Sequence, residues 1–260
     1  ERSNEMINVL FAGDIVGSRG CDFAEDTVRR LKGKEKIDIV IVNGENSADG
    51  NGITKRSMEQ IFNFADVITT GNHCFRRKEF TEYYDIKENL LRPANYPDGV
   101  AGHGVCVLDK GAYSFAVVNL MGTAFMEPLN NPFECIDRLL EDIHTPNILV
   151  DFHAEATSEK KAMGFYLAGK VSAVIGTHSH VQTADEIILN DHTGYITDAG
   201  MCGAELSVLG VKSELAIEKQ RFKCPVRFTE SDNPPFFCGV LMTIDEKCGK
   251  MHSIKRLMIR

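Results

Sequence analysis

The sequence predicts an α/β fold in one domain, in which two β-sheets face each other and helices cover the outside. The first half of the chain alternates short apolar runs with helix-like segments, as is typical of an α/β sheet. Two regions break this alternation, a strand pair over Gly104–Leu120 and a strand-rich end over Pro225–Ile259. A mixture of this kind favours a sheet-on-sheet core flanked by helices.

The expected elements follow one another along the chain. Short, almost wholly apolar runs are typical of buried strands, and they predict strands over Asn8–Ala12, Ile37–Val42, Val67–Thr70, Asn147–Phe152 and Val171–Ile175. Longer segments in which apolar and polar residues mix predict helices over Phe23–Leu31, Lys55–Phe64, Pro132–Ile143 and Thr157–Leu167. The first of these helices is expected after a glycine turn.

Turns and loops complete this outline. The strand pair is expected to turn near Lys110-Gly111, and the strand-rich end near Glu246–Lys250. Two prolines in Arg92–Gly99 predict a loop, from which a small subdomain around residues 92–103 could begin. Nothing in the sequence indicates a repeat or a linker, so residues 6–260 are expected to form one domain.

The composition is that of an ordinary globular protein. Of the 260 residues, 43% are hydrophobic and 25% are charged, and the net charge is −8. An acidic chain is a poor partner for duplex nucleic acid, which usually meets a basic surface. A small phosphate ligand is still compatible with this charge, because bound metal ions can reverse the local field.

The cysteines and the hydropathy pattern favour a cytoplasmic protein. Eight cysteines include no C-x-x-C pair, and a chain of this length does not need disulfides for stability, so reduced thiols are expected. No apolar run approaches the ~18 residues of a membrane span. The segment before Met6 is polar and unlike a signal peptide, and Met6 is a candidate native start.

Polar side chains with metal-binding chemistry follow five of the predicted strands. They are Asp14 after the first strand, Glu45 and Asn46 after the second, Asn72 and His73 after the third, His153 after the fourth, and His178 and His180 after the fifth. Open α/β sheets bind ligands at the carboxyl ends of their strands. Each residue alone has a simpler explanation as a turn, cap or surface residue, but five strand ends of this kind together indicate one site.

His178 and His180 are the strongest single indication. Residues that alternate along an extended segment point to the same side, so both rings could face one metal. Nitrogen and oxygen donors without a cysteine cluster disfavour a structural zinc site and favour manganese, iron or catalytic zinc. The set is too large for one open catalytic metal, which predicts two divalent ions sharing a carboxylate.

Longer motifs resemble one family. Gly-Asp after the first strand, Gly-Asn-His later and a late Gly-x-His-x-His are similar to the calcineurin-like metallophosphoesterase superfamily. The strings Asn43-Gly44-Glu45-Asn46, Leu91–Asn95, Asp151–Glu159 and Gly176–Asp185 resemble the bacterial YmdB-like family of cyclic-nucleotide phosphodiesterases, and the likeness extends over nearly all the chain from Met6 onward.

This resemblance implies a four-layer α/β/β/α sandwich and a di-metal site. It implies that the first metal is held by Asp14, Asn46 and His180, and the second by Asn72, His153 and His178, with Glu45 as the bridge. His73 would be the proton donor at the leaving-group oxygen. The implied reaction is hydrolysis of 2′,3′-cyclic nucleotides, and also of 3′,5′-cyclic nucleotides, by in-line attack of a metal-bridging hydroxide.

The sequence departs from the pattern of these relatives at a few positions. Val16 stands where the superfamily usually has histidine, a loss that the YmdB-like group shares. Cys74 follows Gly-Asn-His, Phe75-Arg76 replaces the frequent Trp-Asp, and Thr123 replaces an arginine. These changes leave the expected metal ligands in place. They concern residues that could affect substrate preference.

Other functions are compatible with parts of the sequence. A metal-stabilised regulatory module that binds a nucleotide or a protein partner, with little turnover, would need the same ligands, and the chain could form a homo-oligomer. A metal-dependent amidohydrolase is disfavoured because its His-x-His pair follows the first strand. A dinucleotide-binding protein is disfavoured because Gly13, Gly17 and Gly20 do not form the G-x-G-x-x-G fingerprint.

Overall fold

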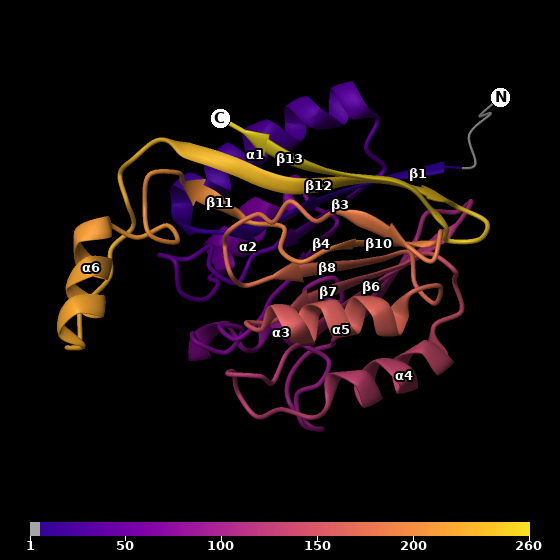
Figure 1. The fold of residues 1–260 in the computed structure, drawn as a ribbon, viewed down its shortest axis with the longest axis horizontal. Coiled ribbons are helices and arrows are strands. Elements are labelled where there is room, and N and C mark those ends of the chain that lie inside the picture. The colour runs from indigo at the N-terminus through magenta and orange to yellow at the C-terminus, as the bar shows by residue number, and fades with distance from the viewer. Residues whose placement is uncertain (1–5) are drawn as a thin grey trace.

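Two mixed β-sheets lie face to face in the computed structural model, which describes residues 6–260 (Figure 1). The expectation about the segment before Met6 therefore falls outside the described residues. The first sheet has seven strands in the order β2-β11-β12-β1-β3-β4, with β13 paired to β12. Its strands are β1 (Met6–Ala12), β2 (Asp14–Ile15), β3 (Ile39–Asn43), β4 (Val67–Thr69), β11 (Met201–Ala204), β12 (Pro235–Asp245) and β13 (Met251–Ile259).

The second sheet has six strands in the order β5-β6-β7-β8-β10-β9. They are β5 (Val105–Asp109), β6 (Ser114–Met121), β7 (Ile148–His153), β8 (Ala173–Thr177), β9 (Ile187–Leu189) and β10 (Thr193–Ile196). Strands β6, β7, β8 and β10 are parallel to their neighbours in this series, and so are β1, β3 and β4 in the first sheet. Each sheet therefore brings several strand carboxyl ends to one edge.

Helices form the two outer layers (Figure 1). The first sheet is covered by α1 (Gly17–Glu35) and α2 (Lys55–Phe62), and the second by α4 (Pro132–Asp142) and α5 (Thr157–Leu167). Short turns η1 (Lys78–Phe80) and α3 (Tyr83–Ile86) precede β5, and α6 (Ser213–Phe222) stands away from the layers. The predicted four-layer α/β/β/α sandwich is confirmed.

Apolar side chains fill all three spaces between the layers. Along β1, Val9 and Phe11 pack between the sheets, whereas Leu10 and Ala12 pack against α1 and α2. Both faces of the strand are thus buried, which is why its sequence reads as a continuous apolar run instead of an alternating one. A third cluster lies between the second sheet and α4 and α5.

Most of the predicted elements occur within a residue or two of their expected bounds, and among the helices α1 differs most. This helix begins at Gly17, not at Phe23. Gly17, with a φ of 68°, stands at the start of the helix, and Gly20 lies within it where α1 meets β11. A Cβ atom there would be 2.3 Å from the carbonyl oxygen of Cys202, so this glycine permits close packing and does not end the element.

The strand-rich end is shorter than predicted. Residues 225–234 are irregular apart from one bridge at Glu230, and the first long strand begins at Pro235. Residues 92–103 form a loop closed by a bridge between Leu91 and His103, inside which the Arg92 guanidinium donates to the carbonyl oxygens of Pro93, Val100 and Ala101. A small subdomain in this region stays a prediction.

Two expectations about the whole chain can be compared with the structure. All eight cysteines are free, and six of them are buried. Within residues 6–260, no helix combines the length and the apolar character needed to cross a membrane.

Candidate metal centre

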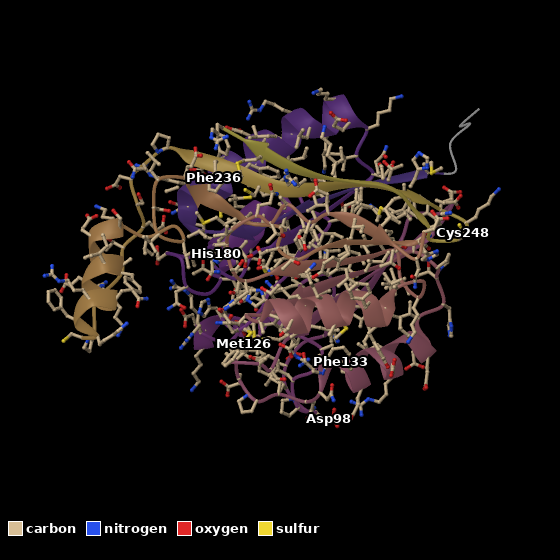
Figure 2. All side chains as sticks on the ribbon, viewed as in Figure 1. Asp98, Met126, Phe133, His180, Phe236 and Cys248 are labelled. Atoms are coloured by element: carbon tan, nitrogen blue, oxygen red, sulfur yellow. The ribbon has the colours of Figure 1, made fainter. Side chains whose placement is uncertain are left out.

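Every one of the predicted site residues lies at the same edge of the two facing sheets. The first sheet contributes Asp14 at the start of β2 and the residues that follow β3 and β4, namely Glu45, Asn46, Asn72 and His73. The second sheet contributes His153 at the end of β7 and the two histidines after β8. The site faces the side of the molecule on which α6 stands, as the position of His180 shows (Figure 2).

Three candidate ligand atoms converge on Nε2 of His153, whose side chain is fully buried. Its Nε2 atom lies 3.2 Å from Glu45 Oε1 and 3.0 Å from Asn72 Oδ1. The same nitrogen lies 3.1 Å from Nδ1 of His178. Glu45, His153 and His178 each offer an atom within 4.8 Å of the others. Such a group of nitrogen and oxygen donors is suited to one cation.

A second group forms around Asp14. His180 Nε2 lies 3.9 Å from Asp14 Oδ1 and 3.1 Å from the side-chain amide of Asn46. That amide is in turn 3.2 Å from Glu45 Oε1. The single oxygen Oε1 of Glu45 therefore faces both groups, while Oε2 accepts the backbone N–H of His73 at 3.1 Å. Of the two carboxylate oxygens, Oε1 is the one placed for a shared ligand.

Asp14 provides the clearest test of whether a metal fits here. Its side chain is fully buried, and its Oδ1 atom is one of only two buried side-chain polar atoms in residues 6–260 without a hydrogen bond. A buried carboxylate oxygen without a partner is costly, and buried charges are normally paired or bound to metal. A cation beside Asp14 Oδ1 and His180 Nε2 would satisfy this oxygen, and Asn46 could join them through its side-chain oxygen, which faces His73 in this structure. The donor set therefore fits a metal.

Opposite charges in the site shift the pKa values of His153 and Glu45. Burial acts to lower the pKa of His153, but Glu45, and then Asp14 and Asp151, outweigh it and raise the pKa to about 9. Burial acts to raise the pKa of Glu45, yet the histidines beside it hold that pKa well below its usual value. Without metal, the His153 ring is therefore protonated. A metal ion that binds this ring must first displace the proton from the binding nitrogen.

His178 differs from His153 in its surroundings. Burial, and then the positive charge of His153, lower its pKa to about 3, so its ring is neutral and able to bind a metal. Its Nε2 atom lies 2.9 Å from Glu155 Oε2. A carboxylate on the far nitrogen fixes the ring and leaves Nδ1 facing the ligand group. Glu155 was not among the predicted site residues.

The predicted reason for the pairing of His178 and His180 is wrong. Strand β8 ends at Thr177, and both histidines have left-handed backbone conformations, with φ of 102° and 64°. Their rings reach the site through this strained turn, not through the alternation of an extended strand. Backbone strain of this kind persists where the surrounding structure holds it in place, often at functional sites.

Gly44 brings the loop after β3 close to β4. Strand β3 ends at Asn43, so the expectation that Glu45 follows the end of the strand is confirmed. A Cβ atom on Gly44 would lie 2.9 Å from the side chain of Ile68. Only a residue without a side chain therefore allows the loop to lie this close to the strand.

A buried hydrogen-bond network below the site holds His153. The hydroxyl of Thr177 lies 2.9 Å from His153 Nδ1 and donates to Asp151 Oδ1 at 2.7 Å. The other Asp151 oxygen accepts from the amide of Asn43, at 3.0 Å, and from the hydroxyl of Thr69. Burial raises the pKa of Asp151 to about 6. Sequence reasoning missed this network, although Asp151 stands two residues before His153 and thus on the same strand face.

His73 lies at the rim of the site, where a substrate can reach it. Its Nδ1 atom is 2.7 Å from Asn46 Oδ1 and 3.3 Å from Glu45 Oε1, which places the Nδ1 hydrogen toward these acceptors and leaves Nε2 for another partner. The side chain is 23% exposed. It lines a cavity of about 420 Å³ together with Glu45, Asn46, Glu155, His178, His180 and apolar residues that include Leu209 and Phe228.

Cys74, which follows His73, is not part of the ligand set. Its thiol is buried and donates to the hydroxyl of Tyr96 at 3.4 Å. Burial raises the pKa of this thiol to about 12. A cysteine binds metal as the thiolate, so Cys74 is a packing residue here.

Two facing mixed sheets between helices, with Asp, Asn, Glu and His side chains at one common edge, define a metallophosphoesterase-type protein. Over residues 10–257 the sequence matches the family described as YmdB-like protein. The chain belongs to this family.

Individual relatives agree with this placement. The chain is 43% identical to the 2′,3′-cyclic-nucleotide 2′-phosphodiesterase of Bacillus subtilis strain 168, over 97% of each chain. Its fold is similar to the crystal structure of a hypothetical protein from Thermus thermophilus, with a TM-score of 0.92 and 36% identity over 97% of this chain and 98% of the other. It is equally similar to the crystal structure of a novel phosphatase from Mycoplasma pneumoniae, with a TM-score of 0.93 and 32% identity over 98% and 93% of the two chains.

Proposed function

We propose that this protein is a di-metal phosphodiesterase that hydrolyses 2′,3′-cyclic nucleotides, and 3′,5′-cyclic nucleotides as further substrates. The observation that carries the proposal is the pair of donor groups that meet at Glu45 Oε1, one of them containing the unpartnered Asp14 Oδ1. The name of the relative from Bacillus subtilis supports the substrate class.

The two donor groups support the proposed division of the metal-binding residues. Asp14, Asn46 and His180 would hold one ion, and Asn72, His153 and His178 the other, with Glu45 shared between them. The nitrogen and oxygen donors favour iron or manganese, and zinc is the alternative. Two such ions, when bound, would acidify a water molecule and offset the negative charge of a phosphate.

His73 is the residue placed to move a proton. The leaving oxygen of a ribose ester is a strong base and needs a proton as its bond to phosphorus breaks. Asn46 and Glu45 orient the His73 ring through Nδ1, so Nε2 is free to give that proton. The ring also borders the cavity that Glu45, Asn46, His178 and His180 line, which supports a proton donor that a substrate in this cavity can reach.

The state of the cysteines supports a cytoplasmic enzyme. Every cysteine is free, including the buried Cys21, Cys202 and Cys238, as expected where thiols stay reduced.

The test combines metal analysis with kinetics. We expect close to two transition-metal ions per chain and a higher kcat/KM for 2′,3′-cyclic nucleotides than for a phosphomonoester. Chelation should abolish the activity, and iron or manganese should restore it. A fully active sample with one tightly bound metal would contradict the two-metal assignment, and faster monoester hydrolysis would contradict the substrate class.

A further inference from the structure

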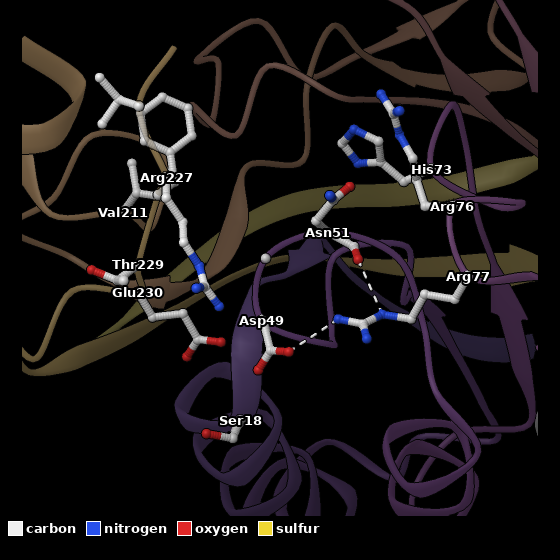
Figure 3. Close-up of a pocket in the computed structure, with 13 residues that line it drawn as sticks. Ser18, Asp49, Asn51, His73, Arg76, Arg77, Val211, Arg227, Thr229 and Glu230 are labelled. Carbon is white, nitrogen blue, oxygen red and sulfur yellow. Dashed lines mark hydrogen bonds and ion pairs between the residues drawn. The ribbon is translucent and has the colours of Figure 1, made fainter. Parts of the chain in front are cut away.

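A second, larger groove adjoins the metal-centre cavity on the side of His73. Its volume is about 980 Å³. The two cavities share Gly50, His73, Val211 and Phe228, so they form one continuous space with His73 at the junction. The part beyond His73 is lined by Ser18, Asp49, Asn51, Arg76, Arg77, Arg227, Thr229 and Glu230, among others (Figure 3).

Three arginines line this groove, and two of them have no partner. Arg77 donates to Asp49 at 3.0 Å and to the carbonyl oxygens of Ala48 and Asn51. Within residues 6–260, the Arg76 and Arg227 side chains form no hydrogen bond or ion pair. Figure 3 shows Arg76 beside His73 and Arg227 reaching into the groove from the opposite wall. In a chain with a net charge of −8, two unpaired guanidinium groups on one groove indicate an anionic ligand.

The two carboxylates of the groove are already engaged. Asp49 is paired with Arg77. The carboxyl group of Glu230 lies against the start of α1, where a Cβ atom on Gly17 would be about 2 Å from it. Among the residues that the structure describes, neither carboxylate forms an ion pair with Arg76 or Arg227. The positive charge of these two arginines is thus left for a ligand.

The position of the groove indicates which part of a substrate would occupy it. His73 is assigned to the leaving oxygen, and in a 2′,3′-cyclic nucleotide that oxygen belongs to the ribose. The nucleoside must therefore extend past His73, away from the metal ligands, into the groove. The next charged group along a nucleotide is the phosphate on the 5′ oxygen of the same ribose. Guanidinium groups are the side chains best suited to bind a phosphate through paired hydrogen bonds.

An aromatic ring stands at the same junction. Phe228 is 47% exposed and lines both cavities. Exposed aromatic rings beside basic residues stack nucleobases with little sequence preference. A ribose between His73 and the arginines would bring its base within reach of this wall.

We propose that the Arg76–Arg227 groove is a second phosphate subsite, and that the preferred substrate is a nucleotide with a 5′-phosphate as well as the 2′,3′-cyclic phosphate. This inference rests on the proposed function, because His73 defines the leaving-group side. The second phosphate could belong to a 5′-phosphorylated mononucleotide or to the last linkage of an RNA fragment with a cyclic end. The chemistry that the arginines recognise is the same in both.

The first experiment compares three substrates of the metal-loaded protein: adenosine 2′,3′-cyclic phosphate, its 5′-phosphorylated form, and an adenylate dinucleotide with a 2′,3′-cyclic end. We expect kcat/KM to rise about three- to tenfold when the 5′-phosphate is present, as for a partly exposed charged contact. A higher value for the dinucleotide than for the 5′-phosphorylated nucleotide would identify RNA ends as the source, and the reverse would identify mononucleotides. Equal values for all three would overturn the proposal.

Variants of Arg76 and Arg227 test whether these arginines cause the preference for a second phosphate. Arg76→Gln and Arg227→Gln should each lower kcat/KM for the two substrates with a second phosphate and leave the cyclic mononucleotide nearly unchanged. Arg56→Gln is the matched control, because Arg56 is exposed and lines neither cavity. A preference that persists in the double variant R76Q/R227Q would overturn the assignment of the subsite to these arginines.

A binding measurement separates this inference from the proposed function. Adenosine 3′,5′-bisphosphate should bind more tightly than adenosine 3′-phosphate, about three- to tenfold by calorimetry, and R76Q/R227Q should remove the difference. If no cyclic nucleotide is hydrolysed but this difference holds, the proposed function fails and the second phosphate subsite stands. Equal affinities in the wild-type protein would overturn the subsite whatever the activity.

Discussion

Lys160 and Asp198 form a buried ion pair directly beneath the His-x-His segment. The Lys160 Nζ atom lies 2.7 Å from Asp198 Oδ2, and the two side chains are 2% and 0% exposed. The same oxygen accepts the backbone N–H of Ser179 at 3.0 Å, and the other oxygen accepts that of Gly200 at 2.9 Å. Ser179 stands between His178 and His180, so this pair holds the strained turn that carries both histidines.

Asp198→Asn should destabilise the protein by about 3–5 kcal/mol, because the Lys160 ammonium would remain buried without a counter-charge. Lys160→Met should cost less, since the remaining carboxylate keeps two backbone N–H donors. Urea unfolding measures both values. Metal content should fall in Asp198→Asn, which weakens the acceptor of the Ser179 N–H, and fall less in Lys160→Met, which keeps that acceptor. Lys161→Met is the control, because Lys161 pairs with Asp185 at the surface and should change stability by about 0–1 kcal/mol.

Glu45→Gln and Asn46→Ala should separate the shared ligand from a terminal one. The glutamine keeps the size and one oxygen donor but removes the negative charge between the two donor groups. We expect a folded protein whose affinity for at least one metal falls by about 10–100-fold or more, the range already seen for residues that only orient a ligand. Asn46→Ala removes a neutral donor and should cost less. Elemental analysis and the rise in melting temperature on metal addition are the measurements, and normal retention of both metals by E45Q would contradict the shared role.

The acid stability of the fold should depend on Asp185. Partial burial acts to raise its pKa, but hydrogen bonds from Thr183 and Thr197 and the contact with Lys161 lower it to about 2. Because the folded-state pKa lies below the unfolded value, the stabilisation is present above pH ~4 and is lost as the pH falls toward 2. At ~1.4 kcal/mol per unit, and with allowance for partial exposure, the contribution is about 1–2 kcal/mol at neutral pH.

Asp185→Asn tests this dependence. The variant should be less stable than the wild type at pH 7, and the gap in free energy of unfolding should shrink between pH 4 and pH 2. Urea titrations at several pH values would show it. A gap that stays constant across this range would mean that the side chain acts by size or hydrogen bonding and not through its charge.

The gathering of the candidate ligands at one edge could be predicted from the sequence because it depends on a local pattern. Each follows an apolar run, and the carboxyl ends of parallel strands meet at one edge of a sheet. The supporting contacts depend on distant parts of the chain and leave no such pattern. Asn43 and Asp151 come from different sheets, and Glu155 lies beyond the end of β7 in a turn.

The parts of the fold that sequence reasoning missed lack a periodic signal. Helix α6 buries only Ala216, so its apolar residues do not recur on one face as they would in a helix packed on a core. Strands β9, β10 and β11 have three or four residues each, too few to show alternation. The left-handed turn at His178 and His180 is held by Asp198, a contact that the sequence pattern did not reveal.

His73→Ala should lose turnover while it keeps metal, and the loss should depend on the leaving group. None of the seven expected ligands is removed, so metal content should stay close to that of the wild type. A general acid contributes about 10²–10⁴-fold, and a ribose oxygen needs the proton far more than a nitrophenolate, which leaves readily as an anion. We therefore expect a loss of this size on 2′,3′-cyclic nucleotides and a much smaller one on bis(nitrophenyl) phosphate, measured as kcat/KM on samples of known metal content. Equal losses on both esters would show that His73 positions the phosphate or a metal, because those roles do not depend on the basicity of the departing oxygen.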